Sequence, residues 1–282
     1  MRLLAIDTSG SALSAALALC LPPRQPEISG CFGLHTGKNH SLALLPMLQA
    51  MLENSGLMLC DLDAFAVTVG PGSFTGLRIG IATVKAWAQA LDKPLFAISS
   101  TQAMALAAGG EGYICPLFDA RRDEVYCALF CDGERLWPDQ ALAPAALAEK
   151  LAALGKPVLL AGDGLPACLP LLQAVPGLQL RPLQPQHDLF MAPAAAVLAC
   201  GKYARGEVTP LQELLPCYLR LSEAEEKRLA AGGKIATGEL WLHSGLPAAD
   251  AADAAGDAAA VNTAADADDA NETANGIRKD PA

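Results

Sequence analysis

The chain has 282 residues, of which 52% are hydrophobic and only 18% are charged, a composition that excludes a disordered protein and allows a sizeable buried core. Its formal net charge is −10; the residues after 249 include eight acidic and two basic side chains, which leaves −4 for residues 1–249. No basic stripe follows the sequence, so tight binding of nucleic acid by this chain alone is not expected.

The cysteines and the apolar segments of the sequence indicate the cellular compartment of the protein. The nine cysteines stand singly, without a CxxC pair or a zinc-ligand spacing, and mostly in apolar segments, so we expect reduced core thiols. Asp7 interrupts the first apolar run before a signal peptide could form, and no later run reaches the ~18 apolar residues of a membrane span. These patterns predict a cytoplasmic protein without membrane contact.

The first part of the chain predicts a hairpin followed by alternating helices and strands. Helices are indicated by apolar residues three or four positions apart, and strands by short apolar runs that end in turn residues. In chain order the predicted elements are a strand over 3–6, a turn over 7–10, a strand over 12–21, a helix over 41–54, a strand over 64–69, a turn over 70–72 and a helix over 75–91.

The later part echoes this beginning. A second predicted hairpin again has an aspartate where its first strand ends, and Asp119 follows Asp7 by 112 positions. Such an echo favours a duplicated lobe. The predicted elements are strands over 114–118 and 125–130 with a turn over 119–124, a helix over 144–154, a strand over 157–160, a turn over 162–164, a helix over 192–204 and a final globular segment over 214–220.

These elements suggest two lobes and a tail. We expect residues 1–105 to form the first lobe, completed by 206–228, and residues 106–205 to form a second, smaller lobe. Residues 229–282 consist mainly of Ala, Asp, Gly and Asn. Such a segment buries too little apolar surface to offset its ordering entropy, so we expect an acidic, disordered tail.

The stretch Gly70–Gly80, GPGSFTGLRIG, is the most informative motif. A strand that passes through this turn into a helix directs several backbone N–H groups to one point, where an anion could bind. The motif lacks the Gly-Lys-Ser/Thr ending of a phosphate-binding loop, and on spacing alone an ordinary tight connection is favoured. The helix that follows has one bulky face and one of small residues, so packing on its own sheet and close contact with another protein are both open.

Two aspartates mark the ends of the first strands of the two hairpins. Asp7, with Thr8 and Ser9, and Asp119 occupy positions where two-lobed ATPases place phosphate and magnesium contacts. Ordinary turn chemistry explains the same residues equally well. The segment Gly162-Asp163-Gly164 could likewise receive an adenine ring or be a simple loop.

The histidines and cysteines do not indicate catalysis. His35 and His40 are five positions apart, and Leu44 stands where a second metal ligand on the helix would follow His40. The sequence has neither a Gly-x-Ser-x-Gly elbow nor a cysteine with a recognisable catalytic neighbourhood. We therefore expect no metal site and no catalytic residue, and a peptidase activity has no support.

Five ordered motifs together resemble a known family. They are Leu3–Ser9, His40-Ser41 with Leu44-Leu45-Pro46, Gly70–Gly80, Asp119–Tyr126 and Pro216–Arg220. Over residues 1–226 the chain resembles the TsaB (YeaZ) family, companions of the tRNA threonylcarbamoyl transferase TsaD. The resemblance implies the actin, sugar kinase and Hsp70-like (ASKHA) α/β fold, with two related lobes that each have a central mixed sheet flanked by helices.

The same resemblance implies a partner and an interface. TsaB proteins form a heterodimer with TsaD through two first-lobe helices, which correspond here to residues 41–53 and 75–91. The nucleotide cleft of the family is degenerate, so its positions are expected to be inherited architecture: Asp7, Thr8, Ser9, Asp119, Gly162, Asp163 and Gly164. The expected partner interface comprises His40, Leu44, Leu45, Leu48, Met51, Thr75, Gly76, Ile79, Gly80, Thr83 and Ala86.

The implied function is that of a non-catalytic activator. The complex forms threonylcarbamoyladenosine at position 37 of tRNAs that read codons beginning with A, with TsaE as an ATPase component. The chain itself would need no cofactor, whereas the complex uses ATP and Mg²⁺; tRNA would be reached only through the complex, and a homodimer could form in isolation. The alternative is an ATP-dependent phosphotransferase of the same fold that uses Asp7 and Asp119.

Overall fold

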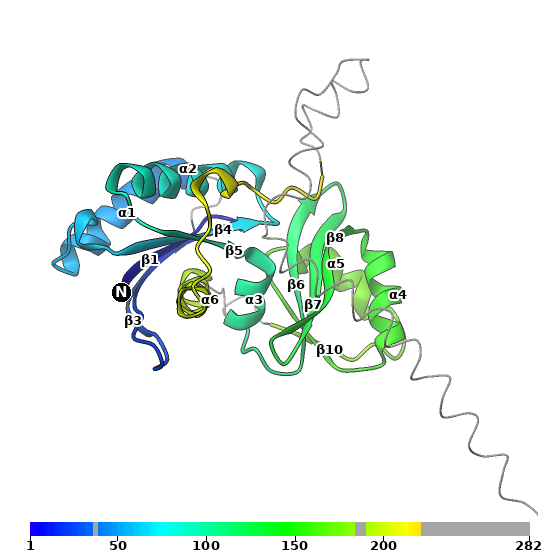
Figure 1. The fold of residues 1–282 in the computed structure, drawn as a ribbon. Helices are drawn as coiled ribbons and strands as arrows, with labels where there is room; N and C mark the ends of the chain where they lie inside the picture. Colours follow the sequence, from blue (N-terminus) through cyan, green and yellow to red (C-terminus); the bar gives the residue numbers. More distant parts are fainter. Residues whose placement is uncertain (36–38, 184–189, 221–282) are drawn as a thin grey trace, which may run out of the picture. The chain divides into compact units, whose positions relative to one another are not determined.

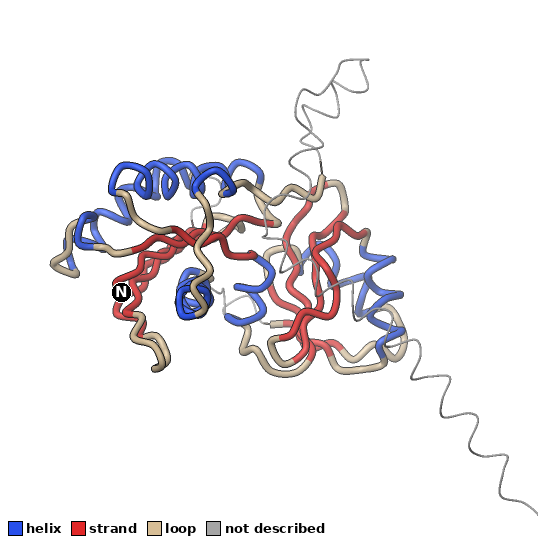
Figure 2. The backbone as a smooth tube through the Cα atoms, in the orientation of Figure 1, coloured by secondary structure: helices blue, strands red, loops and turns tan. Residues whose placement is uncertain are grey.

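The computed structural model describes residues 1–35, 39–183 and 190–220, all of which belong to one compact unit that spans Met1–Leu246. Two five-stranded mixed sheets, each flanked by helices, make up this unit (Figures 1 and 2). The expected α/β architecture of two related lobes is confirmed. The predicted tail, 229–282, lies outside the described residues, as do residues 221–228.

The two sheets repeat one topology. Each is built from three antiparallel strands followed by two parallel ones, and each lobe runs strand, strand, strand, helix, strand, helix, strand, helix. The strand orders are β3-β2-β1-β4-β5 and, read from the opposite edge, β8-β7-β6-β9-β10. This repetition agrees with the duplication that the hairpin echo suggested.

In the first repeat, the elements that the sequence predicts have bounds close to the predicted ones. Its elements are β1 (Arg2–Asp7), β2 (Ala12–Leu19), β3 (Glu27–His35), α1 (His40–Asn54), β4 (Ala64–Gly70), α2 (Phe74–Leu91), β5 (Leu95–Ser99) and α3 (Ser100–Ala107), with a short 3-10 turn at Leu59–Asp61.

The second repeat follows directly. Its elements are β6 (Tyr113–Arg121), β7 (Glu124–Cys131), β8 (Glu134–Leu142), α4 (Pro144–Leu154), β9 (Val158–Ala161), α5 (Leu165–Gln173), β10 (Leu180–Pro182) and α6 (Ala192–Ala204), with a 3-10 turn at Leu211–Glu213. None of the helices in the described ranges is long and apolar enough to cross a membrane.

The first sheet buries both of its faces. Along β1, Leu4 and Ile6 point into the core beneath α1 and α2, while Leu3 and Ala5 point toward α6, because successive strand residues face opposite sides. Figure 1 shows α1 and α2 on one side of this sheet and α6 on the other. The layer against α6 is rich in alanine on both sides, which lets this helix pack closely on the strands.

Local sequence explains where the main helices begin and end. The hydroxyl of Ser73 accepts a hydrogen bond from the N–H of Gly76 and caps α2, and Ser99 caps α3 in the same way. Helix α4 ends at Gly155, whose φ of 61° lies in the left-handed region that glycine tolerates. These caps fix the helix ends relative to the preceding strands.

The structure differs from the sequence prediction in several elements. Patterns in the sequence did not identify β3, β5, α3, β8, α5 or β10. Helix α6 lies within residues 106–205, the range expected for the second lobe, yet it packs on β1, β2, β4 and β5 of the first sheet. Its alanine-rich surface matches the alanines of those strands, a long-range fit that chain order does not reveal.

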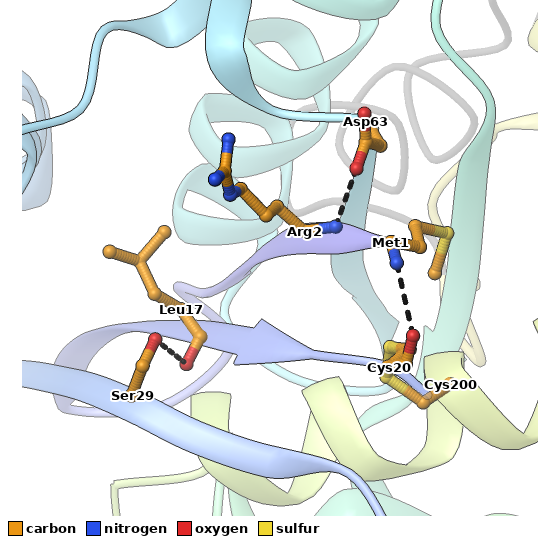
Figure 3. Close-up of a disulfide and its surroundings, with 7 residues drawn as sticks. All are labelled: Met1, Arg2, Leu17, Cys20, Ser29, Asp63 and Cys200. Carbon is orange, nitrogen blue, oxygen red and sulfur yellow. Dashed lines mark hydrogen bonds between the residues drawn. A yellow bond between two sulfur atoms is a disulfide. The ribbon is translucent and has the colours of Figure 1, made fainter. Parts of the chain in front are cut away.

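The expectation of nine reduced core cysteines is wrong. Cys20, directly after β2, and Cys200, in α6, form a disulfide with Cα atoms 5.6 Å apart (Figure 3). The packing of α6 across β2 brings these residues together over a sequence separation of 180. Cys31 and Cys60 are exposed and therefore do not belong to the core.

Candidate functional site

Two turns, one from each sheet, meet at a cleft of about 610 Å³. The first turn, residues 8–11, joins β1 to β2, and the second joins β6 to β7. Of the predicted cleft positions, Ser9, Asp119 and Asp163 line this cleft, whereas Asp7 is buried and is not part of its lining. The structure therefore brings together residues from both hairpins that the sequence singled out.

Asp7 ends β1 as a buried carboxylate that is engaged within the protein. Its Oδ1 accepts hydrogen bonds from the Ser9 backbone N–H at 3.1 Å, the Ser9 hydroxyl at 2.7 Å and the Thr68 hydroxyl at 2.6 Å. Burial raises the pKa of Asp7, and these donors oppose that rise because they stabilise the charged form. The side chain thus joins the first turn to β4, on which Thr68 lies.

The first turn also holds the start of α2. The Thr8 hydroxyl donates to the Gly76 carbonyl at 2.8 Å, and the Ser73 N–H donates to the Ser9 carbonyl at 2.7 Å. A Cβ atom on Gly76 would lie 2.1 Å from the Thr8 carbonyl oxygen, and one on Gly80 would lie 2.4 Å from the Thr8 hydroxyl oxygen. The glycines of the motif therefore allow α2 to lie directly against this turn.

Helix α1 begins on the same turn. Its first residue, His40, is buried, and Nε2 of its ring lies 3.1 Å from the carbonyl oxygen of Gly10. The imidazole also lines the cleft. His40 was predicted at a partner interface; in the structure its side chain is buried against the first turn and faces the cleft, away from the outward side of α1.

Asp163 connects the two hairpins. Its Oδ2 accepts the backbone N–H of Ser11 at 2.8 Å, and its Oδ1 accepts the backbone N–H of Asp119 at 3.2 Å. Burial raises the pKa of Asp163, and the two backbone donors oppose the rise. In this segment, for which the sequence left an adenine-binding turn and a simple loop both open, the aspartate side chain bridges the ends of the two repeats.

The glycines on either side of Asp163 are required by close packing on β6. A Cβ atom on Gly162, whose φ is 118°, would lie 2.2 Å from the Leu117 carbonyl oxygen. One on Gly164 would lie 2.8 Å from the carbonyl carbon of Phe118. The segment Gly162-Asp163-Gly164 is therefore a tight connection from β9 to α5 that presents one carboxylate at a fixed position.

Asp119 stands at the equivalent end of β6 but has different surroundings. Its Oδ1 accepts the backbone N–H of Arg121 at 2.8 Å, and its Oδ2 lies 2.7 Å from Nη1 of the same arginine, whose side chain is 71% exposed. Residues 121–123 have φ values of 63°, 55° and 57°. The second turn is thus an exposed, left-handed loop that points its polar groups to solvent and to the cleft.

A C-terminal segment crosses the start of α2. Tyr218 stacks on Phe74 with ring centroids 4.5 Å apart, and its hydroxyl accepts a hydrogen bond from Nε of Arg78 at 2.8 Å. Two residues later, Arg220 forms an ion pair with Glu124 of β7. In the sequence this segment stands out only as a motif, because its contacts join residues about 96 to 144 positions apart, for which local patterns carry no signal.

The outward sides of α1 and α2 form one exposed surface, which we call the helical face. Both helices lie on the same side of the first sheet and contact each other (Figure 1). On α1, Leu42 and Leu45 are 75% and 55% exposed. The outward side of α2 carries the small or partly exposed residues Thr75, Ile79, Ala82, Thr83, Ala86 and Ala90, and also the exposed long side chains of Arg78 and Gln89.

Several residues predicted at the interface lie elsewhere. Leu44, Leu48 and Met51 are buried in the core between α1 and the first sheet, and Gly76 and Gly80 are buried against Thr8. They occupy the inner sides of their helices, so they cannot contact a partner. Of the predicted set, the helical face retains Leu45, Thr75, Ile79, Thr83 and Ala86.

Some residues of the helical face are absent from the predicted interface. Leu42 precedes Leu45 by three positions, a helical spacing that could have indicated a shared side. Ala82 and Ala90 belong to the small-residue face that the sequence indicates for this helix, and they lie on the same outward stripe as Thr75, although the predicted interface does not include them. Alanine alone gives no sign of direction, because it is common on both sides of a helix.

Known proteins resemble the chain over most of its length. A family model described as TsaD, tRNA N6-adenosine threonylcarbamoyltransferase, matches residues 25–161. The tRNA threonylcarbamoyladenosine biosynthesis protein TsaB of Bacillus subtilis is 36% identical over 236 residues, which cover 80% of this chain and 97% of that protein. The Escherichia coli protein of the same name is 33% identical over 237 residues, 80% of this chain and 98% of that protein.

Solved structures give the same result. The structure of YeaZ from Pseudomonas aeruginosa is similar, with a TM-score of 0.62 and 31% sequence identity, over 77% of this chain and 99% of that one. The shared two-lobed arrangement agrees with the ASKHA-like fold expected from the motifs. From the identity to TsaB proteins over nearly their whole length, we conclude that the chain belongs to the TsaB (YeaZ) family.

Proposed function

We propose that this chain is a non-catalytic activator subunit that binds a TsaD partner and enables it to form the threonylcarbamoyl group on adenosine 37 of tRNAs that read codons beginning with A. The names of the Bacillus subtilis and Escherichia coli relatives refer to tRNA threonylcarbamoyladenosine biosynthesis, which supports the same role here. The match of residues 25–161 to the TsaD model supports a partner with a related fold.

The observation that carries the non-catalytic role is the state of Asp7. A phosphotransferase of this architecture needs a strand-end carboxylate that can approach Mg²⁺ and phosphate. Here the carboxylate is buried, and one of its oxygens already accepts three hydrogen bonds from Ser9 and Thr68. Asp7 therefore holds β1, β4 and the first turn together, which favours a structural role for this residue over a catalytic one.

The helical face supplies the surface for the partner. Leu42 and Leu45 offer apolar area that is otherwise exposed to water, and the alanines of α2 allow another helix to approach at the short end of the ~8–10 Å range of interaxial distances. Such a contact buries the exposed apolar side chains of both helices. We therefore place the TsaD contact on this face.

The remaining parts of the proposal concern the complex. ATP and Mg²⁺ would be used by the other components, among them the ATPase TsaE, and this chain would need no cofactor. The charge of −4 over residues 1–249 gives no electrostatic reason for direct tRNA binding, so tRNA would be reached through the complex. We place the protein in the cytoplasm, where tRNA is modified, and expect the helical face to form homodimers when the partner is absent.

A reconstituted tRNA-modification assay tests the proposal. The modified nucleoside should form only when the chain is added to TsaD and the other components, and Asp119→Ala should leave its yield unchanged. Modification that proceeds equally well without the chain would contradict the role.

The alternative, an ATP-dependent phosphotransferase, makes a different prediction for the isolated chain. It requires tight binding of Mg·ATP in calorimetry, and loss of that binding in both Asp7→Asn and Asp119→Ala. The activator proposal expects no tight binding by the wild-type chain in the same titration.

A further inference from the structure

The first turn contacts the first residues of both α1 and α2, the helices of the helical face. Asp7 fixes its beginning to β4, Ser9 accepts the N–H of Ser73 at the start of α2, and Gly10 contacts His40 at the start of α1. The turn and the aspartate before it are therefore bonded to β4, α2 and α1. A displacement of the turn would change where both helices begin.

The last residue of the turn is held from the second repeat. The N–H of Ser11 donates to Oδ2 of Asp163 at 2.8 Å, while Oδ1 of the same carboxylate accepts the N–H of Asp119 at 3.2 Å. A Cβ atom on Gly10 would lie only 3.4 Å from Oδ2, so the turn lies in close contact with this side chain. One carboxylate thus sets the separation of the two hairpin ends.

Asp163 is well suited to set that distance. The glycines before and after it pack against β6, and the N–H of Gly164 donates to the Leu117 carbonyl at 2.9 Å. The backbone therefore leaves the aspartate little freedom to move away from β6. The charged groups near its carboxylate are those of Asp119 and Arg121, which act on it with opposite sign.

We propose that Asp163 is a positioning residue: it holds the first turn from the second repeat and thereby fixes the arrangement of α1 and α2 that the partner recognises. The inference rests on the function proposed above and gives the Gly162-Asp163-Gly164 motif a use other than ligand binding. It makes the second repeat a support for the helical face, although the repeat contributes no residue to that face.

The variant that tests this is Asp163→Asn. It keeps the size of the side chain but replaces one acceptor oxygen by an N–H₂ group, which cannot accept from a backbone N–H. The matched control is Asp123→Asn, which makes the same chemical change on the exposed turn between β6 and β7. The positive φ of 57° at Asp123 suits asparagine as well as aspartate.

Amide hydrogen exchange gives the direct readout. In Asp163→Asn, the N–H of Ser11 or of Asp119 should lose protection by about tenfold, the equivalent of one hydrogen bond of about 1.4 kcal/mol. The N–H of Ser73 should lose protection too, because its acceptor Ser9 belongs to the same turn. Amides of α4, which does not contact the turn, should be unchanged. Unchanged exchange at Ser73 would overturn the inference.

Partner affinity separates positioning from simple stabilisation. At a temperature where all variants are fully folded, Asp163→Asn should weaken binding of the TsaD partner by about tenfold, and Asp123→Asn should not. A variant that only lowers the melting temperature would leave this affinity unchanged, and that result would overturn the inference.

Leu45→Glu on the helical face distinguishes the two proposals. If Leu45→Glu abolishes binding while Asp163→Asn has no effect, the inference fails and the proposed function stands. If neither variant affects binding, the proposed use of the helical face fails, and the positioning role falls with it.

Discussion

The two hairpin turns occupy equivalent places in a repeated topology, yet the molecule uses them in opposite ways. In the first, Asp7 is buried and bonded to β4, and the following residues hold the starts of α1 and α2. In the second, Asp119 pairs with an exposed arginine on its own turn, and three consecutive residues have a positive φ. Both repeats have an aspartate at this place, but only in the first is its carboxylate hydrogen-bonded to a neighbouring strand.

The difference shows why a strand-end aspartate is not evidence of a nucleotide site by itself. The same residue type at the same topological position is a core hydrogen-bond acceptor in one repeat and a surface ion-pair partner in the other. What separates them is the number of donors that surround the carboxylate and its exposure to water. Substitutions in each of the two hairpin turns test this difference.

The largest expected difference in stability is between alanine variants of the two aspartates. Asp7→Ala leaves three donors, from Ser9 and Thr68, without their acceptor in a buried site, so it should lower the free energy of unfolding by about 3 kcal/mol. Asp119→Ala removes a surface ion pair and should change it by no more than about 0.5 kcal/mol. Urea denaturation of both variants measures this; equal effects would remove the distinction between the turns.

Much of the fold could be predicted before the structure was known. The hairpins of both repeats and helices α1, α2, α4 and α6 follow from apolar spacing and turn residues, and α4 and α6 have the predicted bounds. Strand β3 was missed because Gly30 and Gly33 interrupt its apolar residues, and α3 because it is short and its sequence contains few large apolar side chains. The place of α6 could not be predicted, since it depends on packing against strands that lie about 90 to 200 residues earlier in the chain.

A smaller effect is expected where the first turn meets α2. Gly80→Ala would bring a methyl group within 2.4 Å of the Thr8 hydroxyl oxygen, and should destabilise the protein by about 1–3 kcal/mol. Gly201→Ala in α6 is the matched control, because the added Cβ would meet only Arg205 at 3.5 Å. The control should stabilise by about 0.5–1 kcal/mol through helix propensity.

Thermal unfolding of this glycine pair sharpens the comparison. If both substitutions stabilise the protein, the contact between Thr8 and α2 is looser than the structure shows. If only Gly80→Ala destabilises it, close packing explains this glycine of the motif.

The smallest effect is a pH dependence caused by Asp7. Burial raises its pKa in the folded state above the unfolded value near 3.8, so the folded protein retains a proton that the unfolded chain has already released. The corresponding stability is present below that unfolded value and is lost as pH rises through the folded pKa. Asp7→Asn keeps a hydrogen-bond acceptor and does not titrate.

Denaturation over a range of pH checks this sign. Between about pH 4 and pH 7, wild type should lose stability relative to Asp7→Asn as pH rises. The exposed variant Asp123→Asn provides the control for carboxyl removal. A constant difference between wild type and Asp7→Asn across this range would show that burial does not control the titration.

The candidate site was less predictable than the fold. The motif Gly70–Gly80 drew attention to α2, but the direction of each side chain depends on how the helix is rotated over the sheet. Gly76 and Gly80 looked like a surface for a partner, whereas their small size serves Thr8 beneath them. Asp163 lies on a third segment and bridges Ser11 and Asp119, which are themselves 108 residues apart in the chain. Local sequence patterns give no sign that these three segments meet.

The most direct test of the account is the affinity of the TsaD partner for two matched variants. Leu45 and Leu171 are both exposed helical leucines, at 55% and 42%, but only Leu45 lies on the helical face. Leu45→Glu should raise the dissociation constant by about 100-fold or more, because a charge would be buried at the contact, while Leu171→Glu should leave it unchanged. Equal affinity of Leu45→Glu and wild type would contradict the proposed use of this face.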